Sequence, residues 1–126
     1  MINFKNKKIL VTGATGGIGK ALVQKFVSLE GNVLATGTKT EKLDALKKEF
    51  PNINILKFDI SDHSKIEEFI ENVASQLVGL DVLVNNAGIN MDNLSLRMKD
   101  DEWKKVIDLN LGSTFFLCKY GIKKML

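Results

Sequence analysis

The sequence predicts an α/β fold with a doubly wound parallel sheet, formed by one domain over residues 1–126. Two observations predict it. Short apolar runs alternate with segments of helical periodicity, and a glycine-rich turn follows the first apolar run. A chain that alternates strand and helix forms parallel strands, because each helix carries the chain back across the sheet. Right-handed crossovers then place helices on both faces and ligand sites beyond the carboxyl ends of the strands.

The first strand and helix have the clearest patterns. Residues 9–11 form a continuous apolar run, as expected of a strand buried on both faces. Over residues 18–30, Ile18, Leu22 and Phe26 recur at four-residue steps, which predicts one packing face of a helix. Gly31 follows, and we expect it to end that helix in the conformation usual for a C-terminal glycine.

The same alternation continues to the end of the chain. We expect strands at 33–35, 53–58 and 82–84, and helices at 41–50, 66–77 and from about 100 onward, with a polar loop at 85–99. Pro51 should stop the second helix, and Ser61 and Ser64 supply side chains that can cap the third. In the last helix, Trp103 and Leu111 belong to the predicted inward apolar face.

Composition excludes several classes of protein. Apolar residues at 44% and charged residues at 26% are typical of a soluble globular domain. The net charge of +3 comes from dispersed lysines, so we expect neither nucleic acid nor a membrane as partner, and no apolar run approaches the ~18 residues of a membrane span. The single cysteine, Cys118, lies among apolar residues, which suggests a buried, reduced thiol and a cytoplasmic protein. Cys118 and His63 are two isolated residues of metal-binding type and do not predict a metal site.

Residues 12–19, TGATGGIG, join the first strand to the first helix and predict a dinucleotide site. Gly13 permits the tight turn, Gly17 lets the backbone approach a pyrophosphate, and Gly19 lets helix and strand pack closely. The helix N-terminus offers free N–H groups to anionic oxygens. A P-loop is excluded by Ala14 and Ala21, whereas a glycine turn without a ligand is the structural alternative.

The second and third strand ends bear on which dinucleotide binds. No Asp or Glu ends the second strand to hold a ribose 2′-hydroxyl, and Thr36, Thr38 and Lys39 offer hydroxyls and a cation instead. This favours NADP(H) over NAD, unless the threonines only cap the next helix. Asp59, after the third strand, can accept from an adenine amino group or merely cap the following turn.

Three asparagines complete the candidate site. Asn85 and Asn86 follow the fourth strand, where their amides can bind a ribose or pin neighbouring strands, and Ala87 and Gly88 leave room beside them. Helical spacing from Trp103 predicts that Asn110 is buried. The hydrogen-bonding groups of a buried asparagine need partners, which can be backbone at a kink, water or a ligand, and the residue can also be purely structural.

These segments, in this order and spacing, resemble the short-chain dehydrogenase/reductase family, whose fold is of the Rossmann type. Residues 85–89, 92–94, 97–99 and 102–103 further resemble β-ketoacyl-[acyl carrier protein] reductases. The resemblance assigns the pyrophosphate to Gly13, Ala14, Thr15, Gly16, Gly17, Ile18 and Gly19, the ribose phosphate to Thr38, adenine to Asp59 and Ile60, and the nicotinamide side to Asn86, Ala87 and Gly88. It also makes Asn110 the catalytic asparagine, placed at a helix kink and holding a proton-relay water.

The activity that the resemblance implies is NADPH-dependent reduction of a 3-oxoacyl thioester on acyl carrier protein, in fatty-acid biosynthesis, by a homo-oligomer that is a tetramer in full-length relatives. Two departures matter. Gly16 stands where many NADP-using relatives have arginine, and the family's serine and Tyr-x-x-x-Lys are not matched. Tyr120 and Lys124 have the spacing of Tyr-x-x-x-Lys. Tyr120 nevertheless follows Asn110 by ten residues, which is ~15 Å along one helix, whereas catalytic groups must lie side by side. We therefore reject Tyr120 and Lys124 as the catalytic pair.

We therefore expect the N-terminal half of such an enzyme, truncated after the helix that follows the fourth strand and inactive alone. The alternative is a nucleotide-binding or interaction module without catalytic activity. Residues 82–84 would form an exposed apolar edge, and the helix that contains Phe115 and Phe116 would lack packing partners. We therefore expect such a module to aggregate or to assemble through these surfaces.

Overall fold

The computed structural model describes residues 2–126 and contains a four-stranded sheet with strand order β3-β2-β1-β4. The strands are β1 (Lys8–Val11), β2 (Asn32–Gly37), β3 (Asn54–Lys57) and β4 (Val82–Val84). All three strand pairs are parallel, as predicted. The chain steps outward from β1 to β3 and then returns to the other side of β1, so a crevice opens at the carboxyl ends of β1 and β4.

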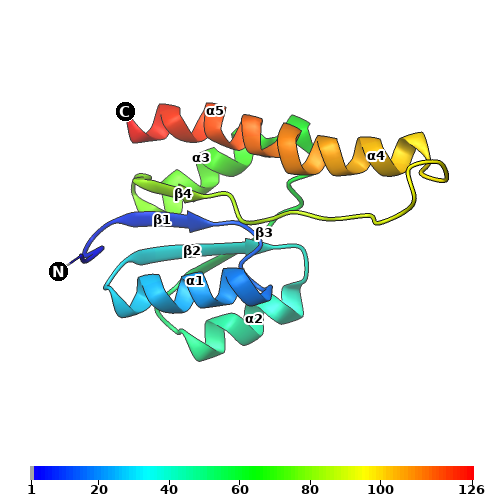
Figure 1. Ribbon diagram of the computed structural model, residues 1–126. Coiled ribbons are helices and arrows are strands. Elements are labelled where there is room, and N and C mark those ends of the chain that lie inside the picture. The colour runs from blue at the N-terminus through cyan, green and yellow to red at the C-terminus, as the bar shows by residue number, and fades with distance from the viewer. Residues whose placement is uncertain (1) are drawn as a thin grey trace.

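Helices cover both faces of this sheet (Figure 1), which confirms the doubly wound prediction. They are α1 (Gly17–Ser28), α2 (Thr40–Glu49), α3 (Ile66–Leu77), α4 (Asp100–Ile107) and α5 (Thr114–Met125), with a 3₁₀ turn η1 (His63–Lys65) and a π-helical turn η2 (Asp108–Ser113). α1 and α2 lie on one face, and α3 and α5 pack together on the other. Within residues 2–126, no helix is both long and apolar enough to cross a membrane.

The core has two layers, one on each face of the sheet. Ile9 and Val11 point into the layer beneath α1 and α2, whereas Leu10 points into the layer beneath α3 and α5. All three side chains are fully buried. A strand buried on both faces has no polar side to alternate with, and this explains the continuous apolar run.

The end of α1 differs from the prediction. The residue in the left-handed conformation is Glu30, with φ of 66°, and not Gly31. Gly31 is instead required by close packing, because a Cβ there would lie 2.7 Å from Cδ1 of Ile9. Its N–H donates to the carbonyl of Phe26 at 2.9 Å, which closes the last turn of the helix.

The start of α3 also differs, because no side chain caps it. The hydroxyls of Ser61 and Ser64 donate instead to the carboxylates of Asp59 and Asp62, both at 2.7 Å. The 3₁₀ turn η1 leads the chain into the helix, so the capping prediction is wrong.

The last predicted helix is interrupted by the π-helical turn η2, and its apolar face is less buried than predicted. Trp103 is 59% exposed and Leu111 is 64% exposed, so the prediction of an inward position is wrong for both. A π turn contains an extra residue, which changes the face of the residues within and after it and so accounts for Leu111, whereas Trp103 precedes the turn. Beyond the turn, Leu117 and Gly121 are the buried residues of α5, and α4 extends past the carboxyl ends of the strands (Figure 1).

The surroundings of Cys118 are more open than predicted. The residue is half-buried, and its Sγ accepts a hydrogen bond from Asn85 Nδ2 at 3.3 Å. Of the two neighbouring aromatic residues, Phe115 is exposed, whereas Phe116 packs against His63 with ring centroids 5.0 Å apart. Phe115 also contacts the ring of Phe116, with centroids 5.4 Å apart, so the prediction that this helix lacks packing partners is wrong for both rings.

Candidate functional site

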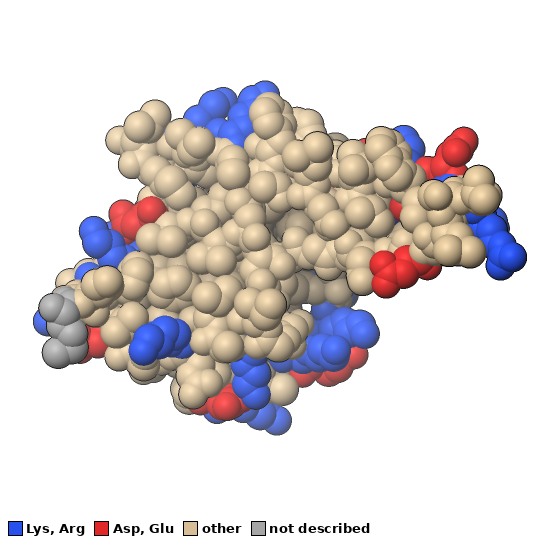
Figure 2. All heavy atoms as spheres, in the orientation of Figure 1, with Lys and Arg blue, Asp and Glu red and all other residues tan. Residues whose placement is uncertain are grey.

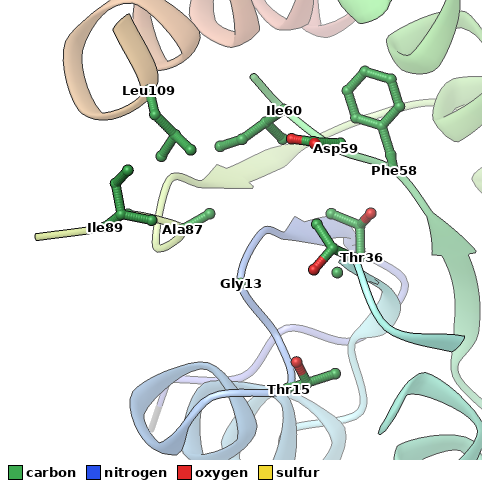
Figure 3. A pocket seen from close by; sticks show the side chains of 12 residues that line it. Gly13, Thr15, Thr36, Phe58, Asp59, Ile60, Ala87, Ile89 and Leu109 are labelled. Atoms are coloured by element: carbon green, nitrogen blue, oxygen red, sulfur yellow. The ribbon is translucent and has the colours of Figure 1, made fainter. Parts of the chain in front are cut away.

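A cleft opens at the carboxyl ends of the strands, where the sequence places the candidate site (Figure 3). Its lining residues are Gly13, Thr15, Thr36, Gly37, Thr38, Phe58, Asp59, Ile60, Ala87, Gly88, Ile89 and Leu109. Apolar side chains, those of Ile60, Ile89 and Leu109, gather on one side, and the hydroxyls of Thr15 and Thr36 lie on the other. The cleft therefore combines an apolar wall with a polar wall beside the glycine-rich turn.

Seven of the predicted site residues border this cleft, and the others lie around it. Those on its wall are Gly13, Thr15, Thr38, Asp59, Ile60, Ala87 and Gly88. Those outside the lining are Ala14, Gly16, Gly17, Ile18, Gly19, Asn86 and Asn110. Thr36, whose hydroxyl the sequence analysis noted, also lines the cleft. So do four residues to which it assigned no role: Gly37, Phe58, Ile89 and Leu109.

Gly13 joins the glycine-rich turn to the loop after β4. It has φ of 60°, and a Cβ would lie 2.8 Å from the Cα of Ala87, so both its conformation and its packing exclude a larger residue. Asn86 Nδ2 donates to the carbonyl of Gly13 at 3.0 Å. The Asn86 amide thus pins neighbouring strands, one of the two predicted possibilities, and brings Ala87 to the cleft.

The next part of the turn faces solvent. Nothing within 4 Å would meet a Cβ at Gly17, and Ile18 is exposed. α1 begins here with no side-chain cap, so the N–H groups of its first turn point outward without a side-chain acceptor. An uncapped helix N-terminus beside a cleft is a suitable binding site for an anion.

Thr12 is a structural residue of the site that the sequence analysis did not assign. Its side chain is buried, and its Oγ1 accepts hydrogen bonds from the N–H groups of Asn86 (3.1 Å) and Ala87 (3.0 Å). The same hydroxyl donates to the carbonyl of Val84 at 3.3 Å. The sequence could have indicated this role, because a threonine directly after a buried strand has a buried hydroxyl that needs hydrogen-bond partners.

The end of β2 brings further polar groups to the cleft. Thr36 Oγ1 donates to the carbonyl of Leu56 at 2.5 Å, which ties β2 to β3. α2 has Lys39 at its N-cap position and no side-chain cap, so the threonines do not serve as caps. Thr38 and Lys39 are both exposed, and Thr38 borders the cleft, where its hydroxyl can meet a ligand.

Asp59 caps the turn that follows β3, which is one of its two predicted roles. Its Oδ1 accepts hydrogen bonds from the N–H and the hydroxyl of Ser61, at 3.0 and 2.7 Å, so the carboxylate does cap the turn after β3. The residue is nevertheless exposed and borders the cleft. A role toward adenine is therefore compatible with the capping role.

Asn110 lies in the π-helical turn and is exposed, so the prediction that it is buried is wrong. Its Oδ1 accepts from the N–H of Ile89 at 2.9 Å, and its Nδ2 donates to the carbonyl of Ile89 at 2.8 Å. Backbone thus satisfies the side chain at a helix irregularity, one of the possibilities left open. A Cβ at Gly88 would lie 3.2 Å from this Oδ1, so the asparagine also needs a small neighbour.

Tyr120 and Lys124 do not border the cleft. Lys124 Nζ forms an ion pair with Glu71 on α3 at 2.7 Å, and Tyr120 packs against the core beneath α3 and α5. These positions agree with their rejection as a catalytic pair.

Comparison with known proteins places the chain in a family. The short chain dehydrogenase profile matches residues 7–126. The 3-oxoacyl-[acyl-carrier-protein] reductase FabG of Salmonella typhimurium is 38% identical over 126 residues, which are 99% of this chain and 52% of that protein. FabG of Rickettsia conorii is 41% identical over 127 residues, or 100% of this chain and 51% of that protein.

Solved structures give the same result. A short-chain dehydrogenase/reductase from Brucella melitensis, described as a glucose/ribitol dehydrogenase, superposes with a TM-score of 0.90 at 31% identity, covering 98% of this chain and 54% of that one. The chain thus spans about half the length of the relatives it matches. Its profile match, its parallel sheet and its glycine-rich turn together show that the chain belongs to the short-chain dehydrogenase/reductase family of oxidoreductases.

Proposed function

We propose that this chain binds NADP(H) and supplies the cofactor-binding part of a 3-oxoacyl thioester reductase, acting on substrates carried by acyl carrier protein in fatty-acid biosynthesis. The observation that carries the proposal is the uncapped N-terminus of α1, open at Gly17 and adjacent to a cleft at the carboxyl ends of the strands. The FabG relatives, similar over this whole chain, support the choice of reaction.

The residues fit a dinucleotide in order along the cleft. The first turn of α1 and the backbone of Gly13, Ala14, Thr15, Gly16, Gly17, Ile18 and Gly19 would hold the pyrophosphate. Thr38 would meet the phosphate on the adenosine ribose, Asp59 and Ile60 the adenine, and the loop of Asn86, Ala87 and Gly88 the nicotinamide-side ribose. The bound cofactor supplies a hydride for the substrate ketone. In this proposal Asn110 holds the loop beside the nicotinamide through Ile89 and borders the proton path.

The direct test titrates NADPH into the purified chain, following nicotinamide fluorescence and thermal stability, with acetoacetyl thioester added to detect oxidation. We expect NADPH to bind and stabilise the chain without turnover, because no tyrosine and lysine flank Asn110 at the cleft within residues 2–126. Absence of binding would contradict the cofactor proposal, and turnover would contradict the rejection of Tyr120 and Lys124.

Selectivity for the 2′-phosphate is predicted to depend on Lys39. Lys39→Glu should weaken NADPH binding about tenfold and leave NADH binding nearly unchanged, because the substitution puts a negative charge beside the phosphate. Lys48→Glu is the matched control, since it makes the same charge change at the other end of α2. Equal effects of the two substitutions on NADPH affinity, measured by fluorescence titration, would argue against a phosphate contact at the N-terminus of α2.

Gly17→Ala is predicted to separate binding from folding. A Cβ at this position meets no atom within 4 Å, and alanine is the better helix former by about 1 kcal/mol, so the melting temperature should not fall. The added methyl group would occupy the surface that we assign to the pyrophosphate, and NADPH affinity should drop at least about tenfold. Unchanged affinity in the same titration would place the pyrophosphate elsewhere.

We also propose self-association, in the cytoplasm, as in the homo-oligomers expected from the family. Leu111, Phe115 and Ile122 are each more than half exposed along η2 and α5. In the view of Figure 2, the charged side chains lie mainly around the rim of the face that contains β4 and α5. A second copy of the chain is the partner we propose for this uncharged surface, and sedimentation velocity tests it.

A further inference from the structure

The π-helical turn that contains Asn110 is supported by side chains from outside the helical ladder. A π turn inserts a residue into that ladder and is usually retained where function needs it. His63 Nε2 lies 2.9 Å from the carbonyl oxygen of Asp108, the first residue of the turn. Thr114 Oγ1 donates to the carbonyl of Asn110 at 2.7 Å. Two backbone carbonyls of the turn, those of Asp108 and Asn110, are thus bound by side chains.

The hydrogen bonds around His63 fix the position of its proton. The carbonyl of Asp108 can only accept, so Nε2 is the donor. Ser113 Oγ, 3.1 Å from the same nitrogen, lies 2.6 Å from the carbonyl of Ile60 and 3.3 Å from that of Asp108, so its one proton goes to a carbonyl and the oxygen accepts from the imidazole. Ser113 is fully buried, and its hydroxyl is satisfied by this arrangement.

The chain is shaped to admit the imidazole ring. A Cβ at Gly112 would lie 2.9 Å from His63 Cε1, closer than packed atoms tolerate. On the other side the ring packs against Phe116, with centroids 5.0 Å apart. His63 is consequently held between the π turn and α5 rather than free on the surface.

We infer that His63 is a positioning residue for Asn110, an inference that rests on the proposed cofactor function. His63 belongs to the segment that follows Asp59 and Ile60 on one wall of the cleft. Through Asp108 it holds the turn from which Asn110 bonds both backbone groups of Ile89, which lines the same apolar wall. One side chain therefore connects the adenine end of the cleft with the loop assigned to the nicotinamide end.

The test measures solvent exchange of the Ile89 backbone amide by NMR, because this N–H donates to Asn110 and has no hydrogen bond with His63. His63→Leu should speed this exchange about fivefold, as expected when one hydrogen bond is lost, and His63→Gln should restore most of the protection. Ser64→Ala is the matched control, since it removes a hydroxyl bond to Asp62 in the same turn without touching the π turn. Wild-type exchange at Ile89 in His63→Leu would overturn the inference.

A double-mutant cycle gives a second test that does not depend on replacing His63 alone. Gly112→Ala should lower the melting temperature in the wild-type background, where the new Cβ meets the ring, and raise it in His63→Ala, where only the better helix propensity remains. Equal changes in both backgrounds would mean that the ring does not pack on the turn, and would overturn the inference.

Cofactor titration separates this inference from the proposed function. We expect His63→Leu to weaken NADPH binding about fivefold and to leave adenosine 2′,5′-bisphosphate, which lacks the nicotinamide side, within about twofold of wild type. If the wild-type chain binds neither compound, the proposed function fails while the exchange experiment still decides the role of His63. Equal weakening of both compounds would overturn the assignment of His63 to Asn110.

Discussion

Gly19→Ala is expected to destabilise the chain by at least about 3 kcal/mol, and to remove NADPH binding as a consequence. A Cβ at this position would lie 2.0 Å from the carbonyl oxygen of Gly13 and 2.8 Å from the Cα of Ala14. Both contacts are with backbone that is itself fixed, because Gly13 packs on Ala87 and the N–H of Ala14 donates to the carbonyl of Thr36 at 3.1 Å. α1 would therefore have to move away from β1.

Urea denaturation followed by circular dichroism measures the loss. For a domain with a total stability of about 5–15 kcal/mol, the midpoint should fall steeply or the folded state should disappear. Gly17→Ala is the matched control, since it makes the same chemical change two residues earlier in the same helix and meets no atom. Equal midpoints for the two variants would show that α1 and β1 are not packed as closely as these distances require.

The sequence predicted the sheet and the glycine-rich turn because both depend on local patterns. Burial of β1 on both faces requires apolar residues at Ile9, Leu10 and Val11, and close packing of α1 on β1 requires a glycine at Gly19. The sequence pattern therefore predicts this packing. For Asp59 the sequence left two roles open, and the structure shows one of them, the hydrogen bond with Ser61, in a residue that also borders the cleft.

The errors arose where the chain leaves regular geometry. The prediction of a buried Asn110 assumed that Trp103 faces inward, but α4 extends past the ends of the strands and Trp103 is exposed. The π turn also interrupts the period of 3.6 residues per turn that the prediction assumed. Glu30 rather than Gly31 takes the left-handed conformation, since the glycine is needed for its contact with Ile9. His63 attracted no functional prediction, because its partners Asp108 and Ser113 lie 45 and 50 residues away in the sequence.

Thr12→Val is expected to reduce the stability of the chain by about 2–3 kcal/mol although the two side chains have nearly the same shape. The substitution removes the only hydrogen-bond acceptor that the structure gives to the N–H of Ala87, and leaves the N–H of Asn86 with the carbonyl of Val84 alone. Ala87 is half-buried, so its N–H would keep much of its desolvation cost without a partner, and a valine methyl group cannot offset that cost.

The same substitution should loosen the loop that carries Ala87 and Gly88 along the cleft, so NADPH affinity should fall together with stability. Thr12→Ser separates the causes, because it keeps the hydroxyl and loses only a methyl group, worth about 1 kcal/mol. We expect amide exchange at Ala87 to be fast in the valine variant and protected in the serine variant. If the valine and serine variants are equally stable and Ala87 is protected in both, the hydroxyl of Thr12 does not hold β4 and its following loop against β1. The packing of Gly13 on Ala87 would then be what keeps this wall of the cleft in place.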